Sequence, residues 1–528
     1  MQTDYGWYPR RWYWMLTLLA LAASSAGMTD AERPHLAVID FQVTPGTAAR
    51  DVWVATAVEE TLAWRLRRVP DLLVVPTVRM HQARRELHDE DTPMPAWPRV
   101  ALALGADYII SGRCSGYADE ANLELKLIRL RAEGATPRVF NTPSGSLFEV
   151  LDSATHWVLR ELKIGPPPDE VRQLIFAQPC RTSSSLEYYA RAIAAVRAGD
   201  AQEARHYVLR SLDYDGRYRP ALAMLAQLEI QSGMRGGLVA EGRLRLLDKL
   251  ARTNNDWHDQ AVAQLGQGAI LQMTGLFDTA YTRYETALAI SYAQGSPYGQ
   301  LAALNNICDL YLTQRIARQA KPSAEQAERY IDASLKRATE WQEIALRMLE
   351  EMGDQVAEAA AVNKLALIYE RRGEWDKALA LHKRTLAVAE RLDSRRNQAS
   401  AWLYIGQCHR RATHWPEAVE SFQRCLSLAP KEAQPIAHMA LAATYRTMEA
   451  PADALREYEV VYEHILAGDD LASQLLCARE IAALRMQLGQ REAALSALQE
   501  AIDVAHALRL PEEAELREQL AEWRERNR

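Results

Sequence analysis

A pattern of Gly followed five residues later by Ala recurs along the chain and constrains its fold more than any other feature. Each copy follows one amphipathic run of residues and precedes another. The copies are Gly199 with Ala204, Gly275 with Ala280, Gly373 with Ala378, and Gly489 with Ala494. Gly readily adopts the left-handed conformation that ends a helix, and Ala lets two helices pack closely. Each copy therefore predicts a helical hairpin.

The Ala positions of the C-terminal copies are evenly spaced. Ala378, Ala418, Ala454 and Ala494 lie 40, 36 and 40 residues apart. The copy at Ala418 has Thr413 where the others have Gly, so the turn residue varies. A period of this length, with one hairpin in each repeat, predicts a solenoid of about eight hairpins over residues 185–508. We expect residues 220–252 to be irregular, 314–324 to be a loop insertion and 509–528 to form a capping helix.

The residues around these Ala positions resemble a tetratricopeptide repeat array. One repeat shows the family spacing in Trp402, Ile405, Gly406, His409, Ala418, Phe422, Cys425 and Pro430. Three further repeats fit the same frame, around Ala366, Ala442 and Ala482. The resemblance implies stacked hairpins whose first helices line a concave groove that binds proteins or peptides.

Residues 35–164 follow a different pattern. Short β-branched or alternating runs at 35–41, 72–75, 107–110 and 122–130 predict strands, and helical periods separate them. This alternation predicts a small α/β domain over 33–164, joined to the solenoid by a Pro- and Ser-rich linker at 165–184.

The phrases Leu36-Ala-Val-Ile-Asp-Phe41, Leu72-Leu-Val-Val-Pro76 and Gly105-Ala-Asp-Tyr-Ile-Ile-Ser-Gly112 resemble the amino-terminal α/β domain of the Tol-system protein TolB. That module occurs in bacterial signalling proteins beside cyclase, kinase or DNA-binding domains and tetratricopeptide repeats. The resemblance implies a module that contacts another protein of the cell envelope.

The N-terminal 28 residues have the features of an export signal. Arg10 and Arg11 precede an uncharged, mostly apolar run at 12–28, and small residues surround Ser24 and Ala26. A positive flank, a short apolar segment and a small-residue exit predict a signal peptide. The same run could remain as an uncleaved membrane anchor. We therefore expect a periplasmic or envelope location, or an inner-membrane anchor facing the periplasm.

Charge and motifs exclude several classes of function. A net charge of −7 argues against nucleic acid as a partner, because phosphate binding requires a basic face. The basic run at 65–68 is interpreted as the solvated side of a helix. We find no phosphate-binding loop, no metal-ligand spacing and no nucleophile motif, so we expect no enzyme activity and no cofactor or metal. Asp40 and Asp107, at strand ends, are the catalytic candidates if the α/β domain is an enzyme.

The six cysteines are scattered and give no redox or zinc pattern. Cys408 and Cys425 lie on partnered predicted helices and could pair in an exported protein. Buried free thiols are the favoured interpretation.

The predicted concave face carries amide and basic side chains. Asn can bond both backbone groups of an extended peptide, and Arg can bind a carboxylate with two donors. These residues predict a groove for an acidic or carboxylate-ended segment. The candidates are Asn305, Asn306, Asp309, Asn363, Lys364, Gln407, Arg410, Arg446 and Arg479.

The sequence therefore predicts an exported, non-enzymatic adaptor that binds a protein or peptide through its repeats. The alternative is a membrane-tethered sensory or regulatory subunit of a cyclase- or kinase-type signalling system.

Overall fold

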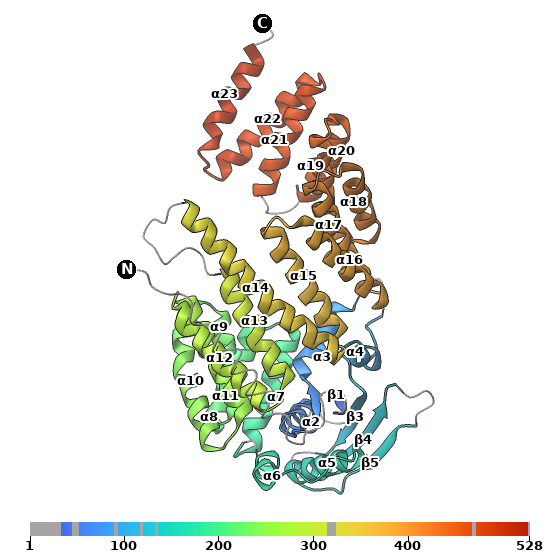
Figure 1. Cartoon of the computed structure of the whole chain (residues 1–528), viewed down its shortest axis with the longest axis vertical. Coiled ribbons are helices and arrows are strands. Elements are labelled where there is room, and N and C mark those ends of the chain that lie inside the picture. Colours follow the sequence, from blue (N-terminus) through green and yellow to red (C-terminus); the bar gives the residue numbers. More distant parts are fainter. Residues whose placement is uncertain are drawn as a thin grey trace. The chain divides into compact units, whose positions relative to one another are not determined.

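The computed structural model describes residues 33–44, 52–88, 93–116, 120–131, 136–178, 180–313, 324–466 and 471–525 (Figure 1). A small mixed β-sheet with its helices is followed by a long succession of helices, which confirms the predicted fold class. The predicted signal segment at 12–28 and most of the predicted insertion at 314–324 lie outside the described residues. Internal contacts divide the chain into two units. The first runs to Ala361 without residues 89–93, and the second contains 89–93 and 362–528.

The sheet of the first unit has the strand order β2-β1-β3-β4-β5. Strand β1 (His35–Val43) runs parallel to β2 (Leu73–Val75) and to β3 (Tyr108–Ser115). Strands β4 (Asn122–Arg129) and β5 (Arg138–Asn141) add antiparallel neighbours. Alternate residues of β4 are buried, as its alternating sequence predicts.

Five helices accompany the sheet: α2 (Trp53–Leu66), α3 (Thr77–Glu86), α4 (Trp97–Ala103), α5 (Leu147–Glu161) and α6 (Asp169–Phe176). The segment predicted to be a linker thus contains the short helix α6. Helix α5 begins at a capping box, in which Ser146 accepts a hydrogen bond from the backbone N–H of Glu149 and donates its own backbone N–H to the Glu149 carboxylate.

One hydrophobic core extends from the sheet into the first repeat helices. It joins apolar residues of β1, α2 and α5 to Leu186 and Ala190 of α7, and to Val208 and Leu225 further along the chain. The α/β part and the first hairpins are therefore packed as one body within the first unit.

The helices of the first unit after α6 pair as hairpins. They are α7 (Ser183–Ala198), α8 (Ala201–Tyr214), α9 (Arg219–Gln231), α10 (Met234–Thr253), α11 (Trp257–Met273), α12 (Phe277–Ala293), α13 (Pro297–Thr313) and α14 (Ala324–Met352). The expectation that residues 220–252 are irregular was wrong, because α9 and α10 occupy them. A Cβ at Gly236 would lie 2.1 Å from the Glu229 carbonyl oxygen. The Gly-rich sequence of this segment therefore allows a close approach between two helices.

The helix α15 (Gln355–Arg371) leads into the second unit. The helices that follow are α16 (Trp375–Arg391), α17 (Arg395–Arg411), α18 (Trp415–Leu428), α19 (Gln434–Thr447), α20 (Pro451–Ile465), α21 (Leu471–Gln487), α22 (Arg491–Ala507) and α23 (Glu512–Glu525). The turns after α15 and α21 contain Gly373 and Gly489 with φ of 74° and 75°. Thr413 has φ of 62° at the equivalent place, which confirms the predicted left-handed turn.

The basic run at the end of α2 is buried, so its interpretation as a solvated face was wrong. The side chains of Arg65 and Arg68 are both 0% exposed. Arg65 pairs with Asp152 of α5 at 2.7 Å, and Arg68 pairs with Asp256 at 2.7 Å, at the start of α11. These carboxylates are distant in sequence, so the local pattern could not indicate that the charges are compensated inside the fold.

Candidate functional site

The predicted binding residues are distributed over both units. Asn305, Asn306 and Asp309 lie on α13 of the first unit. The others lie on the first helices of successive hairpins in the second unit, where Asn363 and Lys364 are on α15 and Gln407 and Arg410 are on α17. Arg446 is on α19 and Arg479 is on α21. We call the surface formed by these six residues of the second unit the first-helix face.

Equivalent positions of the repeats explain why these side chains recur. Arg410 and Arg446 each follow the small residue of their repeat, Gly406 and Ala442, by four positions. Asn363 and Arg479 each precede the corresponding small residue by three. Because the small residues are buried at the packing surface, the flanking positions point along a common side of their helices.

The side chains of Arg410, Arg446 and Glu480 gather around Tyr458 of α20. Arg446 donates a hydrogen bond to Glu480 of α21 at 2.5 Å. Burial and the charge of Glu480 raise the pKa of the Tyr458 phenol to about 12, and both arginines oppose this shift. Residues from α17, α19, α20 and α21 thus form one electrostatically connected cluster.

Two polar atoms of the first-helix face are buried without a hydrogen-bond partner among the described residues. They are Nε of Arg410 and Oδ1 of Asn363. Burial, together with the neighbouring charge of Arg411, lowers the pKa of the Arg410 guanidinium. Unsatisfied buried polar atoms are uncommon in folded proteins and are costly. Both atoms could be satisfied by an incoming ligand: Arg410 by an acceptor and Asn363 by a donor.

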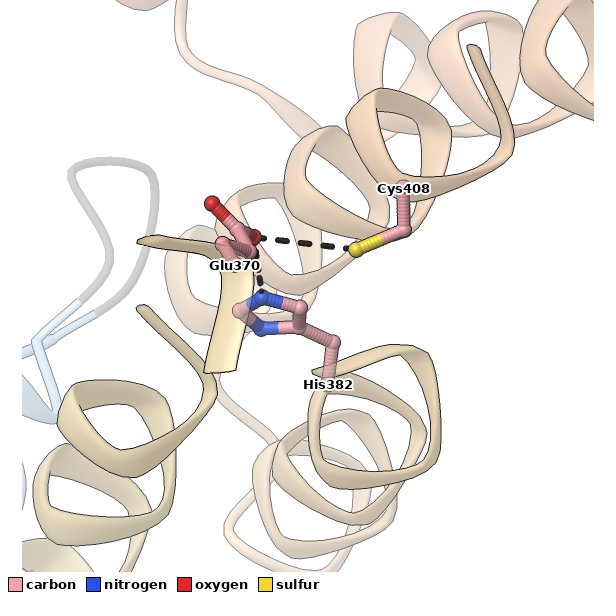
Figure 2. Close-up of side chains that lie close together, drawn as sticks. All are labelled: Glu370, His382 and Cys408. Atoms are coloured by element: carbon pink, nitrogen blue, oxygen red, sulfur yellow. Dashed lines mark hydrogen bonds and ion pairs between the residues drawn. The ribbon is translucent and has the colours of Figure 1, made fainter. Parts of the chain in front are cut away.

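Sequence analysis did not identify a second polar cluster, formed by Glu370, His382 and Cys408 (Figure 2). They come from α15, α16 and α17. Nε2 of His382 lies 2.9 Å from Oε1 of Glu370, and Sγ of Cys408 lies 3.6 Å from the same oxygen. The side chain of His382 is 0% exposed and that of Glu370 is 17% exposed. The ring of His382 stacks on Tyr404, with centroids 5.0 Å apart.

Burial and the adjacent Glu370 carboxylate raise the pKa of the Cys408 thiol to about 12. The thiol is therefore protonated and donates to Glu370. All six cysteines are free and buried, in agreement with the favoured interpretation of the sequence, and Cys408 is not paired with Cys425.

The acidic residues proposed for an enzyme in the α/β domain do not share a site. Asp107 accepts a hydrogen bond from the backbone N–H of His35, at the first residue of β1. Asp40 lies further along β1, where the register with β3 shifts, and accepts a hydrogen bond from Gln42. Five residues of strand separate His35 from Asp40, which corresponds to roughly 16 Å.

Comparison with known families agrees with the geometry of the second unit. Residues 357–431 match the tetratricopeptide repeat family. This segment contains most of α15, all of α16–α18 and every residue of the Glu370–His382–Cys408 cluster. No protein with a curated description matches the chain.

Several solved structures have similar folds. A signal-transduction ATPase with a tetratricopeptide repeat sensor, from Pyrococcus horikoshii, is 12% identical with a TM-score of 0.43, and the match covers 63% of this chain and 54% of the ATPase. The chain thus spans about half the length of that protein. The apo form of RapI is 11% identical with a TM-score of 0.42, covering 64% of this chain and 97% of RapI. A Rap protein complexed with Competence and Sporulation Factor is 15% identical with a TM-score of 0.36, covering 65% and 87% respectively.

We also searched the described helices for membrane spans. None of them is both long enough and apolar enough to cross a bilayer.

Proposed function

We propose that the protein is a non-enzymatic adaptor that binds an acidic or carboxylate-ended protein segment on the first-helix face of its second unit. The observation that carries this proposal is the buried, unpartnered Nε of Arg410. A guanidinium whose donor is withdrawn from water gains most from an anionic acceptor, because the penalty of removing that donor from water is already incurred.

The neighbouring groups favour an extended peptide as the ligand. Asn363 offers a carbonyl oxygen without a partner, suited to a peptide N–H. Gln407 adds an amide beside Arg410, and Arg479 is an exposed cation on α21. Repeat proteins commonly bind segments along such rows of equivalent positions.

A cross-linked pull-down from native cells tests the proposal. We would compare the wild type with Arg410→Glu, which reverses the charge at the centre of the face. Arg456→Glu is the matched control, since it makes the same charge change at a 68%-exposed side chain on the second helix α20. We expect one or a few partners to disappear with Arg410→Glu and to remain with Arg456→Glu. Identical partners for all three proteins would reject the first-helix face as the binding surface.

We further propose that this adaptor acts in the cell envelope. The support is the sequence of residues 10–28, in which two arginines precede a short apolar run. Fractionation of cells with N-terminal sequencing of the mature protein tests this part separately. Recovery from the cytoplasm with residues 1–28 intact would contradict it, and an intact N-terminus in the membrane fraction would favour the tethered regulatory subunit.

A further inference from the structure

We infer that Glu370, His382 and Cys408 form a binding site for a divalent transition-metal ion, and that Zn²⁺ is the ion their donor set fits best. One sulfur, one imidazole nitrogen and one carboxylate oxygen lie within 4.8 Å of one another. Each of these is a ligand type that Zn²⁺ uses in proteins. Three protein ligands would leave a fourth position for water.

The distances between donor atoms agree with a tetrahedral ion. Zn–S and Zn–O bonds of ordinary length place sulfur and oxygen about 3.6 Å apart, and the corresponding nitrogen–oxygen distance is about 3.4 Å. The observed distances are 3.6 Å between Sγ and Oε1 and 2.9 Å between Nε2 and Oε1. Only the nitrogen–oxygen pair must separate, by about half an ångström, and this pair is now held together by a hydrogen bond.

The repeats themselves show that His382 is an unusual choice. It follows the small residue of its repeat, Ala366, by 16 positions. The residues 16 positions after Gly406, Ala442 and Ala482 are Phe422, Tyr458 and Leu498, which are all buried. A buried imidazole therefore replaces a large apolar or aromatic side chain in this repeat, and a carboxylate and a thiol from the neighbouring helices face it.

Binding changes the protonation of the site in a balanced way. The Cys408 thiol loses its proton to solvent and becomes the thiolate ligand, while the proton on Nε2 of His382 moves to Nδ1 so that Nε2 can bind the ion. One proton is released for each ion bound. Nδ1 is buried with no hydrogen-bond partner among the described residues. Because sites that lack such an outer partner typically bind about 10- to 100-fold less tightly, we expect an exchangeable ion.

A bound ion would join three helices. It would link the hairpin α15–α16 to α17, the helix that carries Gln407 and Arg410. The metal site stands on its own geometry and is tested without any peptide ligand.

Titration of the full-length, reduced chain with Co²⁺ in chelator-free buffer tests the inference. We expect saturable visible bands of tetrahedral Co²⁺ with a near-ultraviolet thiolate charge-transfer band, and displacement of both by Zn²⁺. Cys408→Ser should abolish the charge-transfer band, whereas Cys425→Ser, a buried cysteine of α18 outside the cluster, should retain it. Glu370→Gln, which keeps the size and a hydrogen-bonding group, should weaken Zn²⁺ binding about tenfold or more. Circular dichroism establishes that each variant is folded.

Two results would overturn the inference. One is a wild-type spectrum without a saturable thiolate band. The other is a band that persists unchanged in folded Cys408→Ser.

Discussion

Thr413 is a β-branched residue in a left-handed conformation, with φ of 62°. The equivalent turns at Gly373 and Gly489 carry no such conflict between side chain and backbone. A left-handed conformation costs an ordinary residue about 1–2 kcal/mol, of which the greater flexibility of Gly in the unfolded chain takes back a part. We predict that Thr413→Gly stabilises the second unit by about 1 kcal/mol.

The reverse change provides the control. A Cβ at Gly373 would meet nothing within 4 Å, so Gly373→Thr tests the backbone alone and should destabilise the unit by about 1–2 kcal/mol. Urea denaturation followed by circular dichroism measures both variants. A lower unfolding midpoint for Thr413→Gly would show that the threonine side chain supplies stability that its contacts do not reveal.

The buried charges that join α2 to α11 form the strongest electrostatic link at the scale of elements. Arg68 donates to Asp256 and Asp259, and its guanidinium carbon lies 3.8 Å from the centroid of the Trp64 ring. Removing one partner of a buried pair leaves an uncompensated charge. We predict that Arg68→Met destabilises the first unit by about 3–5 kcal/mol, measured by chemical denaturation.

Asp152 provides the comparison for that variant. It is 42% exposed and pairs with the buried Arg65, so Asp152→Asn leaves its own position in contact with solvent. A cost for Arg68→Met no larger than that of Asp152→Asn would mean that the Arg68 cluster does not hold the two helices together.

The same cluster makes stability depend on pH. Burial and the charge of Asp256 raise the pKa of Asp259 to about 6. The folded protein therefore retains a proton that the unfolded chain releases near pH 4, so stability should fall as pH rises from about 4 to about 6. Burial opposes ionisation of Asp256, but Arg68 and Arg219 outweigh it and lower the pKa of Asp256, whose contribution is lost only at more acidic pH.

We predict that Asp259→Asn removes the decrease between pH 4 and pH 6. The measurement is the urea midpoint of wild type and variant across this range. Parallel curves for the two proteins would contradict the assignment of this dependence to Asp259.

The elements with a clear period could be predicted from sequence. Turn residues and evenly spaced Ala positions identified the hairpins of the second unit, and β-branched runs identified β1 to β4. Short elements such as α3 and β5 offer too few residues to establish a period. The compensation of Arg68 could not be foreseen, because its partner Asp256 is 188 residues away.

The candidate sites show the same limit. Arg410 and Arg446 were predicted because they share a frame position. Glu370, His382 and Cys408 were missed because Cys408 lies 38 residues from Glu370, and each residue alone fits a repeat position. Comparing His382 with Phe422 and Tyr458 at the equivalent positions was the available signal.

At the scale of the whole molecule, the α/β part and the first repeats share one hydrophobic core. Leu186 and Ala190 of α7 belong to the same cluster as the residues of α2. A fragment of residues 33–164 would expose this surface and leave Arg68 without Asp256. We predict that 33–164 melts at a temperature at least about 10 °C lower than 33–361, measured by circular dichroism. Equal melting temperatures would show that the α/β part is stable without the helices.

The central claim is that the first-helix face of the second unit recognises acidic segments, and fluorescence anisotropy with peptides of matched length tests it most directly. Acidic, neutral and basic peptides would be titrated with the full chain and with Arg410→Gln. We predict that acidic peptides bind preferentially and that Arg410→Gln weakens them about tenfold, as expected for one charge-assisted hydrogen bond. Equal binding of all three peptide classes, or an unchanged affinity in Arg410→Gln, would contradict the claim.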